Sequence, residues 1–173
     1  VTSVVSALAM HALGSMLPES AWTVVIIGCL CGLLAGLVIG LVNGIGVAWI
    51  GVSPFIMTLG VQSISFGLAL YLTGGVPVSG LPDEFSSLFG FGTLLGIPVS
   101  VLVTAICVVL IGLIMSRLPL GTHLLAVGGN AKAAALSGID TRRVLLTAYL
   151  LCALLASVSG LLLTARVETG EAN

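Results

Sequence analysis

Residues 21–50 read AWTVVIIGCLCGLLAGLVIGLVNGIGVAWI and decide the fold. This stretch holds no charged residue, and the uncharged sequence around it extends from Ser20 through Pro82. At about 20 residues for each membrane span, the uncharged sequence has room for two spans and their turns. Its apolar runs are continuous, which is not the alternating pattern of a transmembrane β-barrel. The pattern predicts an all-α, polytopic transmembrane helical bundle.

The composition points the same way. Of the 173 residues, 58% are hydrophobic and 6% are charged, whereas soluble domains carry roughly 25% charged residues. The net charge of −1 gives no electrostatic reason to expect a nucleic-acid partner. The four cysteines lie in apolar stretches away from other metal-ligating residues, so we expect no metal site. Because the chain begins with Val1 and has no signal-peptide n-region, we expect an internal segment of a longer protein.

Turn-forming residues divide the chain into a partial span that ends near Gly14 and four full spans, which we place at residues 21–50, 55–73, 97–116 and 144–165. The connections are a short turn at 15–20, a break at Gly51-Val52-Ser53-Pro54, and two loops at 74–96 and 117–143. Pro54 makes the break because proline lacks a backbone donor and disfavours helix before it. We expect the whole chain, residues 1–173, to be part of one transmembrane domain.

The basic residues set the orientation. Four of the five lie in the loop 117–143, and the loop 74–96 has none. The positive-inside rule therefore places 117–143 in the cytoplasm and 74–96 outside. By alternation the break at Gly51 is on the cytoplasmic side. Since no charge holds it at the surface, it lies either there or within the membrane as a discontinuous helix.

The cytoplasmic loop contains a short helix with its own start and stop signals. Asn130 can accept hydrogen bonds from the first helical turn, and the alanine-rich run after it favours helix. Gly138 can take the left-handed conformation that ends a helix, with Ile139 as its apolar contact. A helix this short is not stable alone, so we expect a partner to bind it. The alternative, a helix lying on the bilayer, needs several large apolar residues, and only Leu136 qualifies.

Two further patterns concern the spans. Glycine recurs at every fourth position, which predicts a close helix pair within the fold or at a subunit interface; the residues are Gly28, Gly32, Gly36, Gly40 and Gly44. Amide and hydroxyl groups are costly in lipid, so we predict that some of them line a path for a neutral polar solute. The predicted path residues are Asn43, Thr58 and Gln62, together with Phe55 from the face of the span that carries Gln62. Hydrogen bonding between helices is the alternative explanation of these polar groups.

The sequence shows no recognisable catalytic, ion-coupling or nucleotide-binding motif. No Asp, Glu, Lys or Arg lies at the centre of a span, which argues against an ion-coupled pump. No nucleophile and base form a recognisable pair, so we expect no enzyme. The segment Gly128-Gly129-Asn130 follows no strand and lacks the Lys-Ser/Thr of a phosphate loop, so any ATP is bound by another subunit and we expect no cofactor here.

Six segments of the chain resemble the permease subunits of bacterial sugar ABC transporters of the ribose type, within the superfamily of branched-chain amino acid and sugar permeases. The matching segments follow the family's order and cover nearly the whole chain; they are residues 40–44, 53–60, 67–75, 77–82, 128–139 and 159–166. The resemblance implies a permease of about ten spans in the bacterial inner membrane. It also implies a second permease subunit (identical or not), cytoplasmic ATP-binding subunits and an extracytoplasmic protein that delivers a monosaccharide.

The resemblance further implies that the loop 117–143 couples the permease to the ATPase, through Gly128, Gly129, Asn130, Ala133, Ala134, Ser137, Gly138 and Ile139. Family members often carry an acidic residue directly after the Asn, whereas this chain has Ala131 and Lys132 there. A secondary transporter or channel for a small polar solute stays open as the alternative function.

Overall fold

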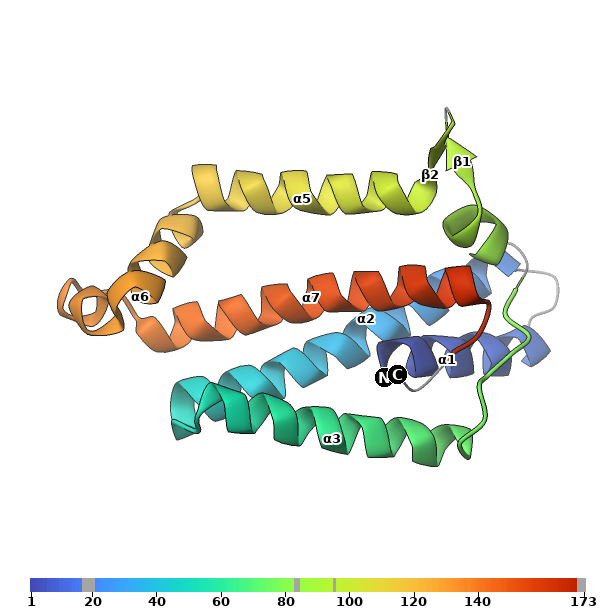
Figure 1. Ribbon diagram of the computed structural model, residues 1–173, viewed down its shortest axis with the longest axis horizontal. Coiled ribbons are helices and arrows are strands. Elements are labelled where there is room, and N and C mark those ends of the chain that lie inside the picture. The colour runs from blue at the N-terminus through green and yellow to red at the C-terminus, as the bar shows by residue number, and fades with distance from the viewer. Residues whose placement is uncertain (17–20, 83–84, 95, 171–173) are drawn as a thin grey trace.

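The computed structural model describes residues 1–16, 21–82, 85–94 and 96–170, and it is built almost entirely of helices (Figure 1). In chain order these are α1 (Thr2–Met16), α2 (Ala21–Ile45), the π-helix η1 (Gly46–Ile50), α3 (Pro54–Thr73), the π-helix η2 (Ser86–Gly90), α5 (Val99–Arg117), α6 (Pro119–Leu136) and α7 (Thr141–Val167). An antiparallel hairpin of β1 (Thr93–Leu94) and β2 (Ile97–Pro98) precedes α5. Most of the turn predicted at 15–20 lies outside the described residues.

The described part of the chain has four helical stretches that are long and apolar enough to cross a membrane, Ala21–Ile50, Pro54–Thr73, Val99–Arg117 and Thr141–Val167. A shorter apolar helix, Thr2–Gly14, precedes them. The expected all-α polytopic bundle, with four full spans and a partial one, is therefore confirmed.

The centre of the bundle is formed by α1, α2 and α7 around the glycine row of α2. Met10 of α1 packs over Gly28 at one end of the row, and Ser157 of α7 covers Gly36 farther along. A Cβ added at either glycine would overlap these side chains, so only glycine allows the helices to approach this closely. The other members of the row are buried in the same way; they are Gly32, Gly40 and Gly44.

Helices α3 and α5 lie at the margins of this centre. No residue of α5 is buried, although the structure describes all of it, and Ala69 is the buried residue of α3. The ends of α5 contact α6 on one side and η2 and β2 on the other, and Figure 1 shows its middle apart from α7. Both helices therefore leave most of their apolar side chains exposed, and part of each helix lines a cavity toward the centre of the bundle.

The loop 74–96 closes the end of the bundle that the charge pattern places outside the cell. Phe85 is only 1% exposed and belongs to the apolar core between α1, α2 and α7. An isolated bridge joins Val78 to Gly170, just beyond the end of α7. Gly90 lies so close to the carbonyl of Ala165 that no side chain fits between them. The loop is thus packed onto the helix ends.

The break after α2 is a turn at the opposite end of the bundle. Helix α2 continues into η1, which ends at Gly51 with a left-handed φ of +79°, and Pro54 starts α3. Glycine adopts this conformation without steric cost. Figure 1 shows the turn at the same end of the bundle as the connection between α6 and α7. The break thus lies at the end of the bundle where the charge pattern predicts the cytoplasm.

The connection 117–143, which the charge pattern predicts to be cytoplasmic, is more helical than its sequence predicts. Helix α6 covers Pro119–Leu136, including residues 119–129 that the sequence analysis leaves as loop. Proline is favourable at a first helical position because its missing N–H has no partner there. Two span limits also shift: Ile97–Pro98 belongs to β2, and α7 begins at Thr141.

Candidate functional site

The short cytoplasmic helix that the sequence predicts is the last part of α6. Asn130 interrupts α6 with extended backbone angles, φ −156° and ψ 98°. Its Oδ1 accepts hydrogen bonds from the backbone N–H groups of Lys132 and Ala133, both at 3.1 Å. Asn130 is therefore the N-cap of a separate helix of residues 131–136, which we name the capped helix.

The other end of the capped helix closes in the predicted way. Gly138 is left-handed, with φ +84°. Its N–H donates to the carbonyl of Ala135 at 3.0 Å, and the N–H of Ile139 donates to the carbonyl of Ala134 at 3.1 Å. These two bonds make a Schellman motif, which satisfies carbonyls that a helix end otherwise leaves without partners. Both ends of the capped helix are thus fixed by local hydrogen bonds.

The capped helix has one inner residue and an open outer surface. Ala134 is 5% exposed, whereas Leu136 is 91% exposed, the largest exposed fraction among the large hydrophobic side chains that the structure describes. The other residues predicted to contact an ATPase are exposed, except for the half-buried Ile139; they are Gly128, Gly129, Asn130, Ala133, Ser137 and Gly138. The helix therefore presents Leu136 and the charged Lys132, one turn apart, among small side chains.

Asp140 joins the capped helix to the start of α7. Its Oδ1 accepts a hydrogen bond from the backbone N–H of Arg143 at 3.3 Å, and its Oδ2 lies 2.9 Å from Nε of the same residue. An ion pair this exposed contributes little stability. Its effect is on geometry, since it orients the first turn of α7 directly after the capped helix.

A cavity of about 520 Å³ lies between α3 and the pair of α1 and α2. It brings together Asn43 of α2 with Thr58 and Gln62 of α3, which are three of the four residues predicted for the solute path. The fourth, Phe55, is 71% exposed and does not line the cavity. Phe66 lines the cavity in place of Phe55, although the polar pattern of the sequence does not indicate Phe66.

The cavity forms because α3 packs closely against the end of α2 only at its first turn and diverges from α2 beyond it. Met57 packs over Gly46 in η1, so the first turn of α3 is held against the end of α2. Figure 1 shows α3 running back along the bundle beneath α2 and α1. The face of α3 that carries Thr58, Gln62 and Phe66 then lines the cavity toward α1 and α2.

The polar groups of the cavity differ in what they can still bind. The hydroxyls of Thr58 and Ser63 donate to backbone carbonyls one turn earlier in α3, both at 2.9 Å. Asn43 Oδ1 is buried and has no hydrogen-bond partner among the described residues. Gln62 is exposed to the cavity side of α3. The exposed Gln62 amide is therefore the freest of these groups to bind a solute, because the Thr58 and Ser63 hydroxyl hydrogens are already used and Asn43 Oδ1 has almost no accessible surface.

Neither site contains a metal centre or a set of catalytic groups. Within the described ranges, no three His, Cys, Asp or Glu side chains come close enough to hold a metal ion. No ionisable side chain lines the cavity in the part of the chain that the structure describes. What the cavity offers is neutral hydrogen bonding beside apolar surface.

Comparison with known proteins agrees with these features. Residues 1–173 match the family described as branched-chain amino acid transport system / permease component. The chain is 35% identical over 130 residues to the ribose import permease protein RbsC of Bacillus subtilis, covering 75% of this chain and 40% of that protein. It is 35% identical over 155 residues to the L-arabinose transport system permease protein AraH of Escherichia coli, covering 90% and 46%.

A third relative is the probable ABC transporter permease protein YphD of Escherichia coli, 40% identical over 121 residues that cover 70% of this chain and 36% of that protein. The chain thus spans less than half the length of these relatives. No solved structure matches it significantly. The family match over the whole chain, together with the four apolar spans, shows that the chain belongs to the family of branched-chain amino acid transport system permease components.

Proposed function

We propose that this chain is part of the membrane-spanning permease subunit of an ATP-binding-cassette importer that carries a monosaccharide across the bacterial inner membrane. Its relatives support this: the names of RbsC and AraH specify ribose and L-arabinose, and that of YphD specifies an ABC transporter. Because the named sugars differ, the proposal is for a monosaccharide as a class.

The observation that carries the proposal is the capped helix at the end of the bundle that is rich in basic residues. Its two caps hold a short helix in one conformation. Leu136, 91% exposed, lies at its end, beside small side chains and one turn after the exposed Lys132. An exposed leucine on a rigid, narrow helix fits an apolar pocket of a soluble partner. A cytoplasmic ATPase subunit bound there supplies the ATP site that this sequence lacks.

Movement of the capped helix would reach the cavity through α7. Helix α7 follows the capped helix directly, and its residues Ser157 and Tyr149 pack onto Gly36 and Gly44 of α2. Because α2 has no side chains at these glycines and the side chains of α7 pack directly onto its backbone, α7 cannot rotate far without moving α2. Since α2 carries Asn43 in the cavity wall, a push on the capped helix changes the shape of the path.

The remaining partners follow from the same proposal. A second permease subunit completes the path across the membrane, and a sugar-binding protein delivers the sugar from outside. The end of the bundle available to such a protein carries the β1–β2 hairpin, with exposed apolar residues at Phe91 (61%) and Leu94 (58%). A rigid, partly apolar surface of this kind suits a transient protein contact.

Purification of the tagged permease that contains this chain from its own membranes tests the proposal. An ATPase subunit with a phosphate-binding loop is expected in the complex, and ATP hydrolysis should rise when a loaded sugar-binding protein is added. The alternative, a secondary transporter or channel, predicts a permease that transports its solute with no ATPase bound. That result would rule out the proposed function.

A further inference from the structure

We infer that the cavity between α3 and α1–α2 is a binding site for a neutral, unphosphorylated monosaccharide, which places one C–H face on the ring of Phe66 and its hydroxyls on the amides of Asn43 and Gln62. The inference rests on the proposed function and adds to it the residues that select the solute. It also assigns a role to an aromatic residue that the polar pattern of the sequence does not reveal.

The size and charge of the cavity agree with such a solute. Its volume of about 520 Å³ lies within the range of roughly 300–1,000 Å³ that is usual for small-molecule sites. The side chains around it are apolar, hydroxyl or amide, and none of those the structure describes there is ionisable. A phosphate or carboxylate brought into this space would lose its hydration without gaining a counter-charge from a side chain. The side chains that line the cavity therefore disfavour sugar phosphates and sugar acids.

Two amides supply the polar side of the site. Asn43 Oδ1 is buried without a hydrogen-bond partner in the described ranges, which is unfavourable for an acceptor. Because this oxygen has almost no accessible surface, the Asn43 amide would meet a sugar hydroxyl through its NH2 group, or after turning its oxygen toward the cavity. Gln62 lies across from Asn43 on α3 and carries both a donor and an acceptor. Paired amides match hydroxyl groups, which also donate and accept.

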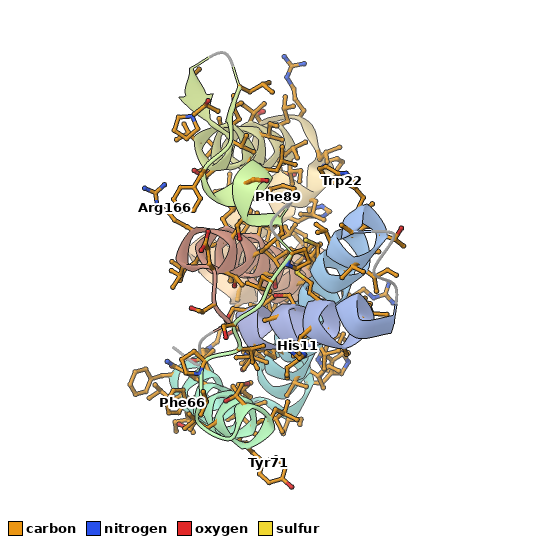
Figure 2. The ribbon with its side chains drawn as sticks, turned by 90° about the vertical axis from the view of Figure 1, so that its right-hand side faces the viewer. His11, Trp22, Phe66, Tyr71, Phe89 and Arg166 are labelled. Carbon is orange, nitrogen blue, oxygen red and sulfur yellow. The ribbon has the colours of Figure 1, made fainter. Side chains whose placement is uncertain are left out.

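Phe66 supplies the apolar side. It follows Gln62 by four residues, so both lie on the same face of α3, and both line the cavity. Its side chain is 47% exposed, so the ring has a free surface. Figure 2 shows Phe66 and Tyr71 leaving α3 in different directions, with Tyr71 pointing away from the bundle. A monosaccharide has apolar C–H patches beside its hydroxyls, and an aromatic ring buries them well.

The aromatic residues of α3 allow a matched test. Phe55 and Tyr71 belong to the same helix as Phe66, are 71% and 83% exposed, and do not line the cavity. Phe66→Leu keeps an apolar side chain but removes the ring, whereas Phe66→Tyr keeps the ring. Phe55→Leu and Tyr71→Leu are the controls.

The experiment measures ATP-dependent uptake of radiolabelled D-ribose, L-arabinose, D-allose and D-fructose by the complete importer in proteoliposomes. For the sugar that the wild type carries, Phe66→Leu and Gln62→Leu should raise KM about tenfold, the size of one lost stacking or hydrogen-bond contact. Phe66→Tyr and both controls should stay within about twofold of the wild type. The 5-phosphate of a carried pentose should not enter.

The outcomes separate the two claims. If the wild type accumulates none of the four sugars with ATP, the proposed function fails, and the inference fails with it. If the wild type carries a sugar but Phe66→Leu behaves like Phe55→Leu, the function stands and the site is wrong. Equal losses in Phe66→Tyr and Phe66→Leu, or uptake of the sugar phosphate, would also overturn the site.

Discussion

Ser157 of α7 lies directly over Gly36 of α2, so that a Cβ added at Gly36 would fall on the Ser157 hydroxyl oxygen. The hydroxyl cannot easily move away, because it donates to the carbonyl of Ala153 at 2.7 Å. This contact joins the span that follows the capped helix to the span that carries Asn43. It is the point where movement at the cytoplasmic end would pass to the cavity.

The contact predicts that Gly36→Ala destabilises the fold although alanine is the better helix former. Alanine gains about 1 kcal/mol of helix propensity over glycine, but overpacking a close contact costs about 1–3 kcal/mol. Gly60→Ala is the matched control, since an added Cβ at Gly60 in α3 meets nothing within 4 Å. Thermal unfolding in detergent should show a loss for Gly36→Ala and none for Gly60→Ala. Equal behaviour of the two variants would contradict this packing.

The left-handed cap of the capped helix gives a second prediction. Gly138 has φ +84°, which costs an L-residue with a Cβ about 1–2 kcal/mol. Gly138→Ala should therefore fray residues 131–136, which hydrogen exchange would detect as faster exchange of their amides. Gly128→Ala is the control, because Gly128 has no left-handed φ and no neighbour within 4 Å of an added Cβ. Unchanged exchange in Gly138→Ala would mean that the cap does not hold the helix.

Leu136 is predicted to matter for the partner and not for the fold. Because Leu136 is 91% exposed, Leu136→Ser should leave thermal stability within about 0.5 kcal/mol of the wild type. Loss of a buried anchor at an interface typically costs about 2 kcal/mol or more, so the variant should bind the ATPase subunit at least about tenfold more weakly. Leu125→Ser, at a residue of α6 outside the capped helix that is 68% exposed, should bind it normally. Equal binding by both variants would remove Leu136 from the interface.

Asn43 should show opposite effects on stability and transport. Its Oδ1 is buried without a partner in the part of the chain that the structure describes, so Asn43→Leu removes an unpaired acceptor and should keep or raise thermal stability. The same change removes a proposed sugar contact and should reduce uptake. Both quantities can be measured on one purified preparation. A clear loss of stability would show that the amide makes a structural hydrogen bond instead.

The sequence predicted the spans well because their signal is local. A helix in lipid must be long and apolar, and the predicted stretch at residues 21–50 matches the observed Ala21–Ile50. The caps at Asn130 and Gly138 were also predictable, since each depends on a few neighbouring residues. Residues 119–129 were not, because the three glycines in that segment are poor helix formers. There Gly121 packs against the backbone of Met115, a contact that only the folded chain provides.

The cavity was only partly predictable. Polar residues in lipid must face protein or water, and this reasoning selected Asn43, Thr58 and Gln62, which do share the cavity. The same reasoning also selected Phe55, which was wrong, because the polar pattern does not show which phenylalanine of α3 faces the cavity. That choice depends on how α3 is turned as it leaves Gly51, and the structure places Phe66 at the cavity and Phe55 away from it. The four-residue spacing from Gln62 to Phe66 was the one available signal.

Measurement of sugar uptake with ATP and with ADP decides whether the permease belongs to an ATP-driven importer. The permease that contains this chain, with its ATPase and sugar-binding protein, would be placed in proteoliposomes with labelled monosaccharide on the side of the binding protein and ATP on the side of the ATPase. For an ATP-driven importer we predict accumulation of the sugar above its external concentration with ATP and none with ADP. Uptake that only equilibrates the sugar, at the same rate with either nucleotide, would show a channel or secondary carrier and rule out the importer.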